Sequence, residues 1–117
     1  MTPIIVRIPL RTISAANACE HWRPRAARVR NERTAVALFR GQMPRRWREQ
    51  QPWLTVSLTR IAPRMLDGDN WQAAAKGIRD QIAVELGLKS DNDPAVTWVY
   101  SQVRGGVREY AVEVMFS

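Results

Sequence analysis

The sequence of 117 residues has few of the residues that build disulfides, thiolate metal sites or membrane spans. It contains one cysteine, Cys19, and one histidine, His21. A single cysteine excludes an intramolecular disulfide and lacks the paired spacing of a thiolate zinc site. No apolar run reaches the roughly 18 residues of a membrane-spanning helix, and Arg7 and Arg11 interrupt the N-terminal apolar stretch too early for a signal peptide. We therefore expect a soluble cytoplasmic protein with no membrane partner.

Acidic residues are also scarce. The chain has 18 Lys+Arg against 11 Asp+Glu, which gives a formal net charge of +7 and a sequence pI near 11.0. This balance favours a polyanionic partner, with nucleic acid the most frequent class and an anionic membrane surface the second. The rest of the composition is typical of a globular protein, and the length predicts a single domain over residues 1–117 that buries roughly two-thirds of its unfolded surface.

The apolar periodicity predicts an α+β domain with the order β-α-β-α-β-β. The predicted strands cover residues 4–10, 53–60, 95–103 and 107–116, and the predicted helices cover residues 21–40 and 69–86. Gly105-Gly106 predicts a hairpin between the last two strands. The final strand is apolar on both faces, which suits a central strand or a subunit contact. We expect two helices packed on a mixed or mostly antiparallel sheet.

The second helix has the clearest pattern in the sequence. Asp69 suits its N-cap, with Gln72 as the capping-box partner, and Gly87 suits its C-terminal end. An apolar stripe at helical spacing runs along one face: Trp71, Ala75, Ile78, Ile82 and Leu86. We also expect Trp22, Trp71 and Trp98 to pack in the core rather than to stack on bases.

Two acidic clusters flank this helix, Asp67-Gly68-Asp69-Asn70 and Asp91-Asn92-Asp93. Asp67 and Asp69 project to the same side of an extended chain. A helix of this length spans about 25 Å, so the loop after it must turn back if Asp91 is to approach them. Three carboxylates brought together suit Mg²⁺ or Mn²⁺. The same residue types also suit turns and helix caps; Asp93, before Pro94, fits a turn.

Basic residues supply the second part of the candidate site. Lys76 lies two turns after Asp69, where it can neutralise phosphate charge in a transition state or pair with Asp80 at i+4. The first helix is rich in arginine, which suits bidentate phosphate contacts. The candidate nucleic-acid-binding residues are Arg23, Arg25, Arg28, Arg30 and Arg33. Asn70 either orients a carboxylate or is an ordinary first-turn residue.

Taken together, these motifs resemble the RusA-like Holliday junction resolvases of phages and prophages. The similarity rests on an Asp-x-Asp-Asn start to a helix and a further aspartate in the loop after it, here Asp67, Asp69, Asn70 and Asp91. Trp98-x-Tyr100-x-Gln102 in the next strand and the upstream Asn17, His21-Trp22 and arginine-rich helix fit the phage branch. The resemblance spans roughly residues 13 to 116.

The resemblance implies a homodimeric, Mg²⁺-dependent endonuclease of the bacterial host cytoplasm that nicks four-way DNA junctions in pairs. Asp67, Asp69 and Asp91 would be the catalytic carboxylates that bind the metal, and no small-molecule cofactor is implied. The chain departs from the family pattern at two positions: Ala73 stands where the best-known member has a lysine, and Ser90 stands where an acid is frequent.

These departures keep two other hypotheses open. The first is a non-catalytic nucleic-acid-binding protein on the same scaffold, which binds in a salt-sensitive way without metal. The second is a protein-interaction module whose basic face meets an acidic partner and which does not prefer branched DNA.

Overall fold

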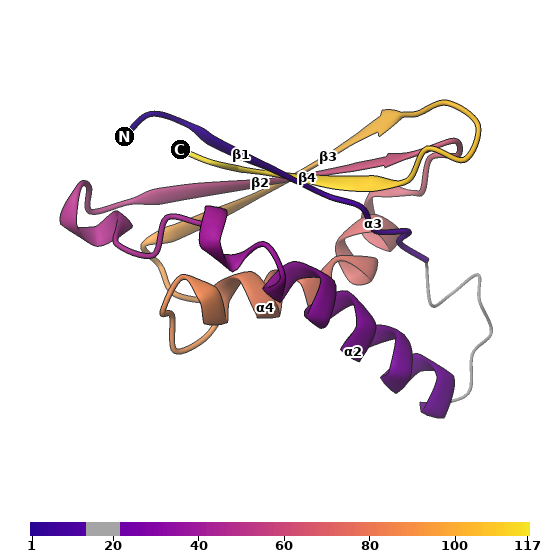
Figure 1. Ribbon diagram of the computed structural model, residues 1–117, viewed down its shortest axis with the longest axis horizontal. Coiled ribbons are helices and arrows are strands. Elements are labelled where there is room, and N and C mark those ends of the chain that lie inside the picture. The colour runs from indigo at the N-terminus through magenta and orange to yellow at the C-terminus, as the bar shows by residue number, and fades with distance from the viewer. Residues whose placement is uncertain (14–21) are drawn as a thin grey trace.

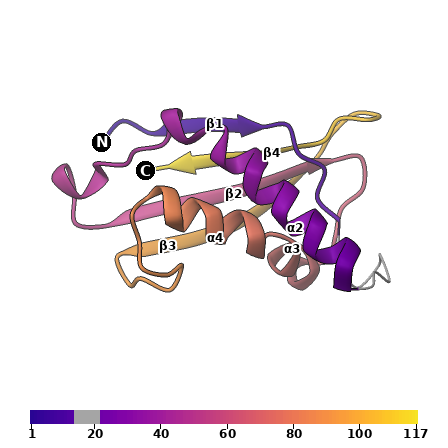
Figure 2. The same cartoon turned by 60° about the horizontal axis from the view of Figure 1, so that its bottom comes forward.

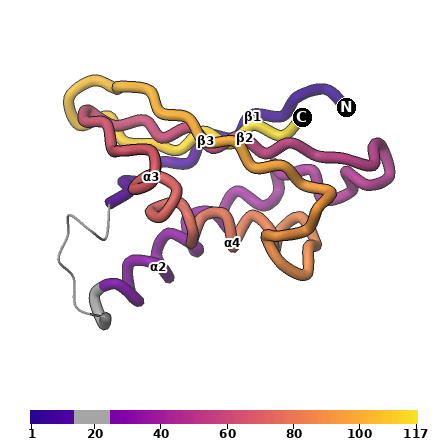
Figure 3. Tube along the Cα trace, turned by 180° about the vertical axis from the view of Figure 1, so that it is seen from behind, coloured from indigo at the N-terminus to yellow at the C-terminus, as the bar shows by residue number. Residues whose placement is uncertain are grey.

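The computed structural model describes residues 1–13 and 22–117; the side chains of residues 22–24 lie outside this description. The strands are β1 (Ile4–Ile8), β2 (Leu54–Ala62), β3 (Val96–Arg104) and β4 (Ala111–Phe116). The helices are α2 (Trp22–Ala37), α3 (Gly68–Ala74) and α4 (Lys76–Glu85), with 3-10 turns η1 (Arg40–Gln42) and η2 (Trp47–Glu49). The helices lie on one side of a single sheet (Figures 1 and 3). The α+β class and the order of elements are as the sequence predicts.

The predicted helix over residues 69–86 is present as two segments that meet at Ala75. This residue ends α3 and begins α4 with right-handed helical dihedrals. Its N–H still donates to the carbonyl of Trp71, and its carbonyl accepts from the N–H of Arg79, so the two segments run end to end. The predicted apolar stripe is confirmed, because each of its members is at most 3% exposed: Trp71, Ala75, Ile78, Ile82 and Leu86.

The strand order in the sheet is β1-β4-β2-β3 (Figure 2). β4 pairs antiparallel with both β1 and β2, whereas β3 pairs parallel with β2. The predicted hairpin between the last two strands is therefore wrong. The chain leaves β3 at Arg104, crosses the end of β2, and enters the sheet on the other side of that strand.

The reason lies in the burial of β4. Val112, Val114 and Phe116 are fully buried, and Ala111 on the opposite face is 2% exposed. In a hairpin with β3, β4 would itself be the edge strand and would have one hydrogen-bonded neighbour. Between β1 and β2 it has two. The expectation of a central position for this strand is thus confirmed. Gly105 makes the crossing feasible, because a Cβ there would lie 3.0 Å from Ile61 and 2.7 Å from the Glu109 carboxylate.

The core lies between the sheet and the helices. Leu54, Val56 and Leu58 alternate along β2 toward the helices, while Thr55, Ser57 and Thr59 lie on the face that no helix covers. α2 packs against α4 at Gly77, where an added Cβ would lie 3.2 Å from Glu32 and 3.3 Å from Val29. A glycine at this point allows the close approach of the two helices.

Each of the tryptophans with a described side chain has a defined place. Trp71 is buried, as predicted, and Trp98 is partly buried with its indole N–H on the Asp91 carbonyl. Trp47 is fully buried and donates to the Leu86 carbonyl, whereas Trp53 is 69% exposed. The Trp22 side chain lies outside the description. Among the described residues, no helix is long and apolar enough to cross a membrane.

Candidate functional site

The first acidic cluster lies at the start of α3, and Asp67 rather than Asp69 occupies the N-cap. The Asp67 carbonyl accepts the first helical hydrogen bond, from the N–H of Trp71 at 2.9 Å. The predicted capping box of Asp69 and Gln72 is wrong, because Asp69 lies in the first turn of α3 and not at its N-cap, and the Asp67 side chain makes no cap hydrogen bond. Gln102 of β3 explains the earlier start, because its side chain accepts from the N–H of Leu66 and donates to the Leu66 carbonyl. This double contact fixes the chain at the residue before the N-cap.

The chain reverses sharply after α4. Gly87 has a φ of +74°, in the left-handed region that favours glycine. The N–H of Leu88 donates back to the Ala83 carbonyl at 2.9 Å, and Leu88 is buried. The loop then runs back along the helix rather than away from it. The turn that the three-carboxylate hypothesis requires is therefore present.

This reversal brings Asp91 to the beginning of α4, where it is 9% exposed. One of its carboxylate oxygens, Oδ2, accepts a hydrogen bond from Lys76 Nζ at 2.9 Å. The same oxygen lies 2.7 Å from Nε of Arg79. That second contact is an ion pair without hydrogen-bond geometry, since the buried Nε has no hydrogen-bond acceptor in the described structure. Two cations from successive turns of α4 thus hold one carboxylate.

Arg79 is itself held on several sides. Its Nη1 donates to the Tyr100 hydroxyl at 2.9 Å, its Nη2 donates to the Asp91 carbonyl at 3.2 Å, and its guanidinium lies 4.8 Å from the Trp98 ring centroid. Tyr100 packs edge-to-face on Trp71 at 6.3 Å. These contacts join α3, α4, β3 and the loop of Asp91, so the position of the carboxylate is determined by three elements.

The charges of this group reinforce one another. The hydrogen bond from Lys76 is the main cause that lowers the pKa of Asp91, and Arg79 adds to it against the opposing effect of burial. The hydrogen bonds to Asp91 and then to Asp80 raise the pKa of Lys76. Asp91 is therefore ionised and Lys76 protonated at neutral pH.

A surface depression of about 530 Å³ lies over these residues, and we call it the Asp91 depression. Its lining includes Lys76, Arg79, Asp91, Tyr100 and, from α2, Arg25. Ala73 also lines it, one turn before Lys76. The lysine of the resembling family is missing at position 73, but Lys76 lines the same depression from the next turn. A concave surface with three cations and one carboxylate is suited to an anionic group.

In the arrangement described, Asp67, Asp69 and Asp91 do not form a Mg²⁺ site. Within the described ranges, no three His, Cys, Asp or Glu side chains come together in a way that could hold a metal ion. Asp67 and Asp69 are exposed at the start of α3. Lys76, which contacts Asp91, lies seven residues after Asp69, or about 10 Å along the helix. One of the two carboxylate oxygens of Asp91, Oδ2, is already in contact with Lys76 and Arg79.

The arginines of α2 differ in their availability. Arg25 and Arg30 are exposed, and Arg25 reaches the Asp91 depression. Arg33 donates to Gln81 of α4 at 3.0 Å, and Arg28 pairs with the buried Glu32 at 3.3 Å. The Arg23 side chain lies outside the described part. Arg28 also donates to the Ile13 carbonyl at 3.4 Å, so Arg28 and Arg33 join α2 to its surroundings, whereas Arg25 and Arg30 are exposed.

Other predicted residues have structural roles. Asp93 accepts from the N–H of Ala95 and pairs with Arg48, which fits the predicted turn. Lys76 makes the predicted i+4 pair with Asp80 at 2.9 Å in addition to its contact with Asp91. Asn70 is partly buried in the first turn of α3. Asn17 and His21 lie outside the described residues.

Sequence reasoning missed Arg79 and Arg60. Arg79 lies three residues after Lys76, on an adjacent part of the same helix surface, and this spacing is the signal that was available. Arg60 continues the core-facing alternation of Leu54, Val56 and Leu58, so its charge lies where an apolar side chain would be expected. The signal available for Arg60 is a charged residue at a position where the alternation of the strand predicts a buried apolar one.

No protein-family model matches this sequence, and no curated protein matches it.

Proposed function

We propose that this protein is a structure-selective DNA endonuclease that resolves four-way junctions. The observation that carries the proposal is the return of Asp91 to the helix that follows Asp67 and Asp69. An isolated turn or cap would not need this loop to fold back, whereas a site made from both acidic clusters does. The net charge of +7 and the exposed Arg25 and Arg30 support a nucleic-acid partner.

In this proposal Asp67, Asp69 and Asp91 are the ligands of Mg²⁺, or of Mn²⁺, and Lys76 faces the scissile phosphate. The three carboxylates are not together in the structure, so the proposal requires α3 and the loop of Asp91 to move closer when metal and DNA bind. The protein acts as a homodimer in the cytoplasm of a bacterial host, because paired nicks in a four-way junction need two sites.

The direct test is cleavage of a synthetic four-way junction with Mg²⁺ or Mn²⁺. The wild type should cut it in paired nicks, and Asp91→Asn should lose at least about 100-fold of that rate, the scale for removal of one group that acts on the reacting centre. Asp93→Asn is the matched control, since it changes an aspartate two residues away that serves a turn. Equal cleavage by wild type and Asp91→Asn, or none by a folded wild type with either metal, would contradict the proposal.

A second candidate is a nucleic-acid-binding protein without catalysis. Two observations favour it: Lys76 and Arg79 contact the Asp91 carboxylate, and among the described residues no three His, Cys, Asp or Glu side chains come together to hold a metal ion. This candidate predicts salt-sensitive binding to junctions in EDTA and no product with any divalent metal. The cleavage assay and a binding assay on the same preparation separate the two.

A further inference from the structure

Arg60 is a buried cation held by neutral groups. It lies near the end of β2 and is only 5% exposed. Its Nε donates to the Thr12 hydroxyl at 2.8 Å, and its Nη1 donates to the Arg64 carbonyl at 2.6 Å and to the Gln102 side chain at 3.3 Å. These acceptors position the guanidinium but do not neutralise it.

The described residues offer Arg60 no counter-ion. No carboxylate lies within 4 Å of Arg60 in residues 1–13 and 22–117. The other arginines with a described, at least partly buried side chain differ: Arg28 and Arg79 pair with carboxylates, and Arg33 donates to the Gln81 side chain. Burial lowers its pKa, but a guanidinium stays charged in proteins. Its Nη2 donates to no acceptor among the described residues. This nitrogen is not buried, so it is accessible to a ligand. A buried charge in this state is costly unless an anion joins it.

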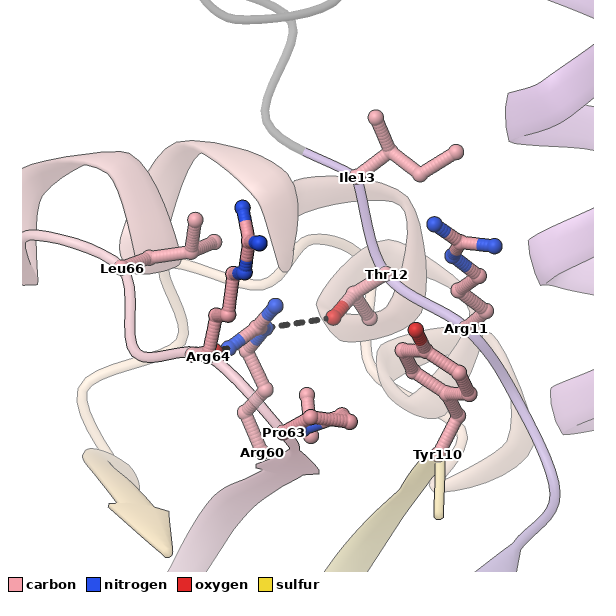
Figure 4. A pocket seen from close by; sticks show the side chains of 9 residues that line it. Arg11, Thr12, Ile13, Arg60, Pro63, Arg64, Leu66 and Tyr110 are labelled. Carbon is pink, nitrogen blue, oxygen red and sulfur yellow. Dashed lines mark hydrogen bonds between the residues drawn. The ribbon is translucent and has the colours of Figure 1, made fainter. Parts of the chain in front are cut away.

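Arg60 faces a pocket of about 440 Å³, and no acidic residue of the described ranges lines it. The pocket lies between the segment after β1, the loop after β2 and the start of β4. Arg11 and Arg64 bring two further guanidinium groups to it, and Arg11 lies 4.7 Å from the centroid of the Tyr110 ring. Figure 4 shows the side chains of Arg60, Arg64 and Tyr110 pointing the same way, with Thr12 beside Arg60. Three arginines around one pocket repel one another unless they share an anion.

The shape and chemistry of this pocket select the class of anion. Arginine forks match phosphate oxygens in a bidentate manner, and the Tyr110 hydroxyl is an additional donor. Apolar groups, including Ile13, Pro63 and Leu66, line the rest, which suits a sugar attached to the phosphate better than a free hydrated ion. Leu66 directly precedes Asp67, and both it and Arg60 bond to Gln102. The pocket is thus next to the first acidic cluster along the chain.

We propose that the pocket of Arg11, Arg60 and Arg64 binds a backbone phosphate of the nucleic-acid strand, one that flanks the candidate site at Asp67. The assignment of the anion to nucleic acid rests on the proposed function; the phosphate chemistry of the pocket does not. Arg60 is the central contact, because it alone is buried, and Arg11 and Arg64 close over the phosphate from the rim.

The first arm of the test uses inorganic phosphate alone. Thermal unfolding of the wild type should shift upward with millimolar phosphate relative to chloride of equal ionic strength, since a ligand of the native state stabilises it by mass action. Arg60→Gln should lose this shift, and it should still fold, because replacement of an unpaired buried charge by a neutral amide removes a cost. If Arg60→Gln fails to fold, Arg64→Gln, at an exposed position, should show the same loss of the phosphate-dependent shift.

The second arm measures binding to a labelled four-way junction in EDTA, so that cleavage plays no part. Arg60→Gln should bind about tenfold more weakly, the scale of one lost hydrogen-bonded charge contact. The slope of log affinity against log salt should also fall in magnitude by about 1. Arg46→Gln is the control: it makes the same charge change at an exposed residue before β2, beyond the opposite end of that strand.

The outcomes separate the pocket from the function. Loss of both the phosphate shift and the junction affinity in Arg60→Gln, but not in Arg46→Gln, supports the proposal whether or not the wild type cleaves. A phosphate shift that is equal in wild type and Arg60→Gln overturns the site. A lost phosphate shift with unchanged junction binding overturns its assignment to the nucleic-acid backbone and leaves free phosphate as the ligand. Absence of cleavage alone contradicts only the endonuclease proposal.

Discussion

At the scale of single residues, two buried charges, Asp91 and Arg60, have opposite surroundings. Asp91 is enclosed by two cations, whereas Arg60 is enclosed by neutral oxygens. The first arrangement is satisfied within the fold, and the second has an accessible donor without an acceptor. The two sites should therefore respond differently to added ligands. A phosphate can accept a hydrogen bond from Arg60 directly, whereas a cation has to compete with Lys76 and Arg79 for Asp91.

The charge of Asp91 should contribute to stability in a pH-dependent way. Because its pKa is lowered from the usual value of 3.8, the contribution is complete above that value and is lost as the pH falls through the lower pKa of the folded state. Asp91→Asn should lower the free energy of unfolding by about 1–2 kcal/mol at pH 7. Urea unfolding of both proteins should show this difference shrinking below about pH 4, the range in which aspartate takes up its proton.

Asp80→Asn is the control for this prediction, since Asp80 makes the more exposed of the two Lys76 pairs. It should change stability by less than about 0.5 kcal/mol. A loss in Asp91→Asn that stays constant down to acidic pH would show that packing of the carboxylate, rather than its charge, stabilises the loop.

At the scale of elements, the sequence predicted what local periodicity determines. The stripe from Trp71 to Leu86 is buried as predicted, because helical spacing alone decides which side chains share a face. The pairing of β4 was mispredicted, because Gly105-Gly106 describes only the turn and not the strand that β4 meets. The N-cap at Asp67 depends on Gln102, which is 36 residues from Leu66. The candidate site divides in the same way: Gly87 predicted where the helix ends, but neither the return of the loop nor its contact with Arg79 could be predicted from the sequence.

The reversal after α4 depends on one glycine. Gly87 has a positive φ and open space around its Cα, so Gly87→Ala tests the backbone conformation without a steric clash. It should destabilise the protein by about 1 kcal/mol, the cost of a side chain in the left-handed region. Gly41→Ala is the matched control, because Gly41 also has open space but no positive φ.

Both variants are compared by urea unfolding at neutral pH. Gly41→Ala should be neutral or slightly stabilising, because alanine restricts the unfolded chain. Equal effects of the two substitutions would contradict the role given to Gly87 in directing Asp91 back to α4.

At the scale of the whole molecule, the endonuclease proposal predicts a homodimer. One chain carries one set of the candidate carboxylates, whereas paired nicks in a four-way junction require two. Static light scattering after gel filtration should therefore give twice the mass of 13.4 kDa. A monomeric mass both free and on a junction would contradict the paired-nick mechanism, and it would leave binding to the Arg60 pocket unaffected.

The place of β4 in the sheet has a consequence for how the protein is made. β1 has its partner in residues 112–116, and β2 also receives one of its two neighbours from β4. Until these residues have been synthesised, β1 has no strand to join and the sheet consists of β2 and β3 alone. During that interval the nascent chain exposes unpaired strand edges, which are the surfaces that aggregate. Long-range pairing of this kind also slows folding, so we expect the sheet to be completed only after β4 has been synthesised.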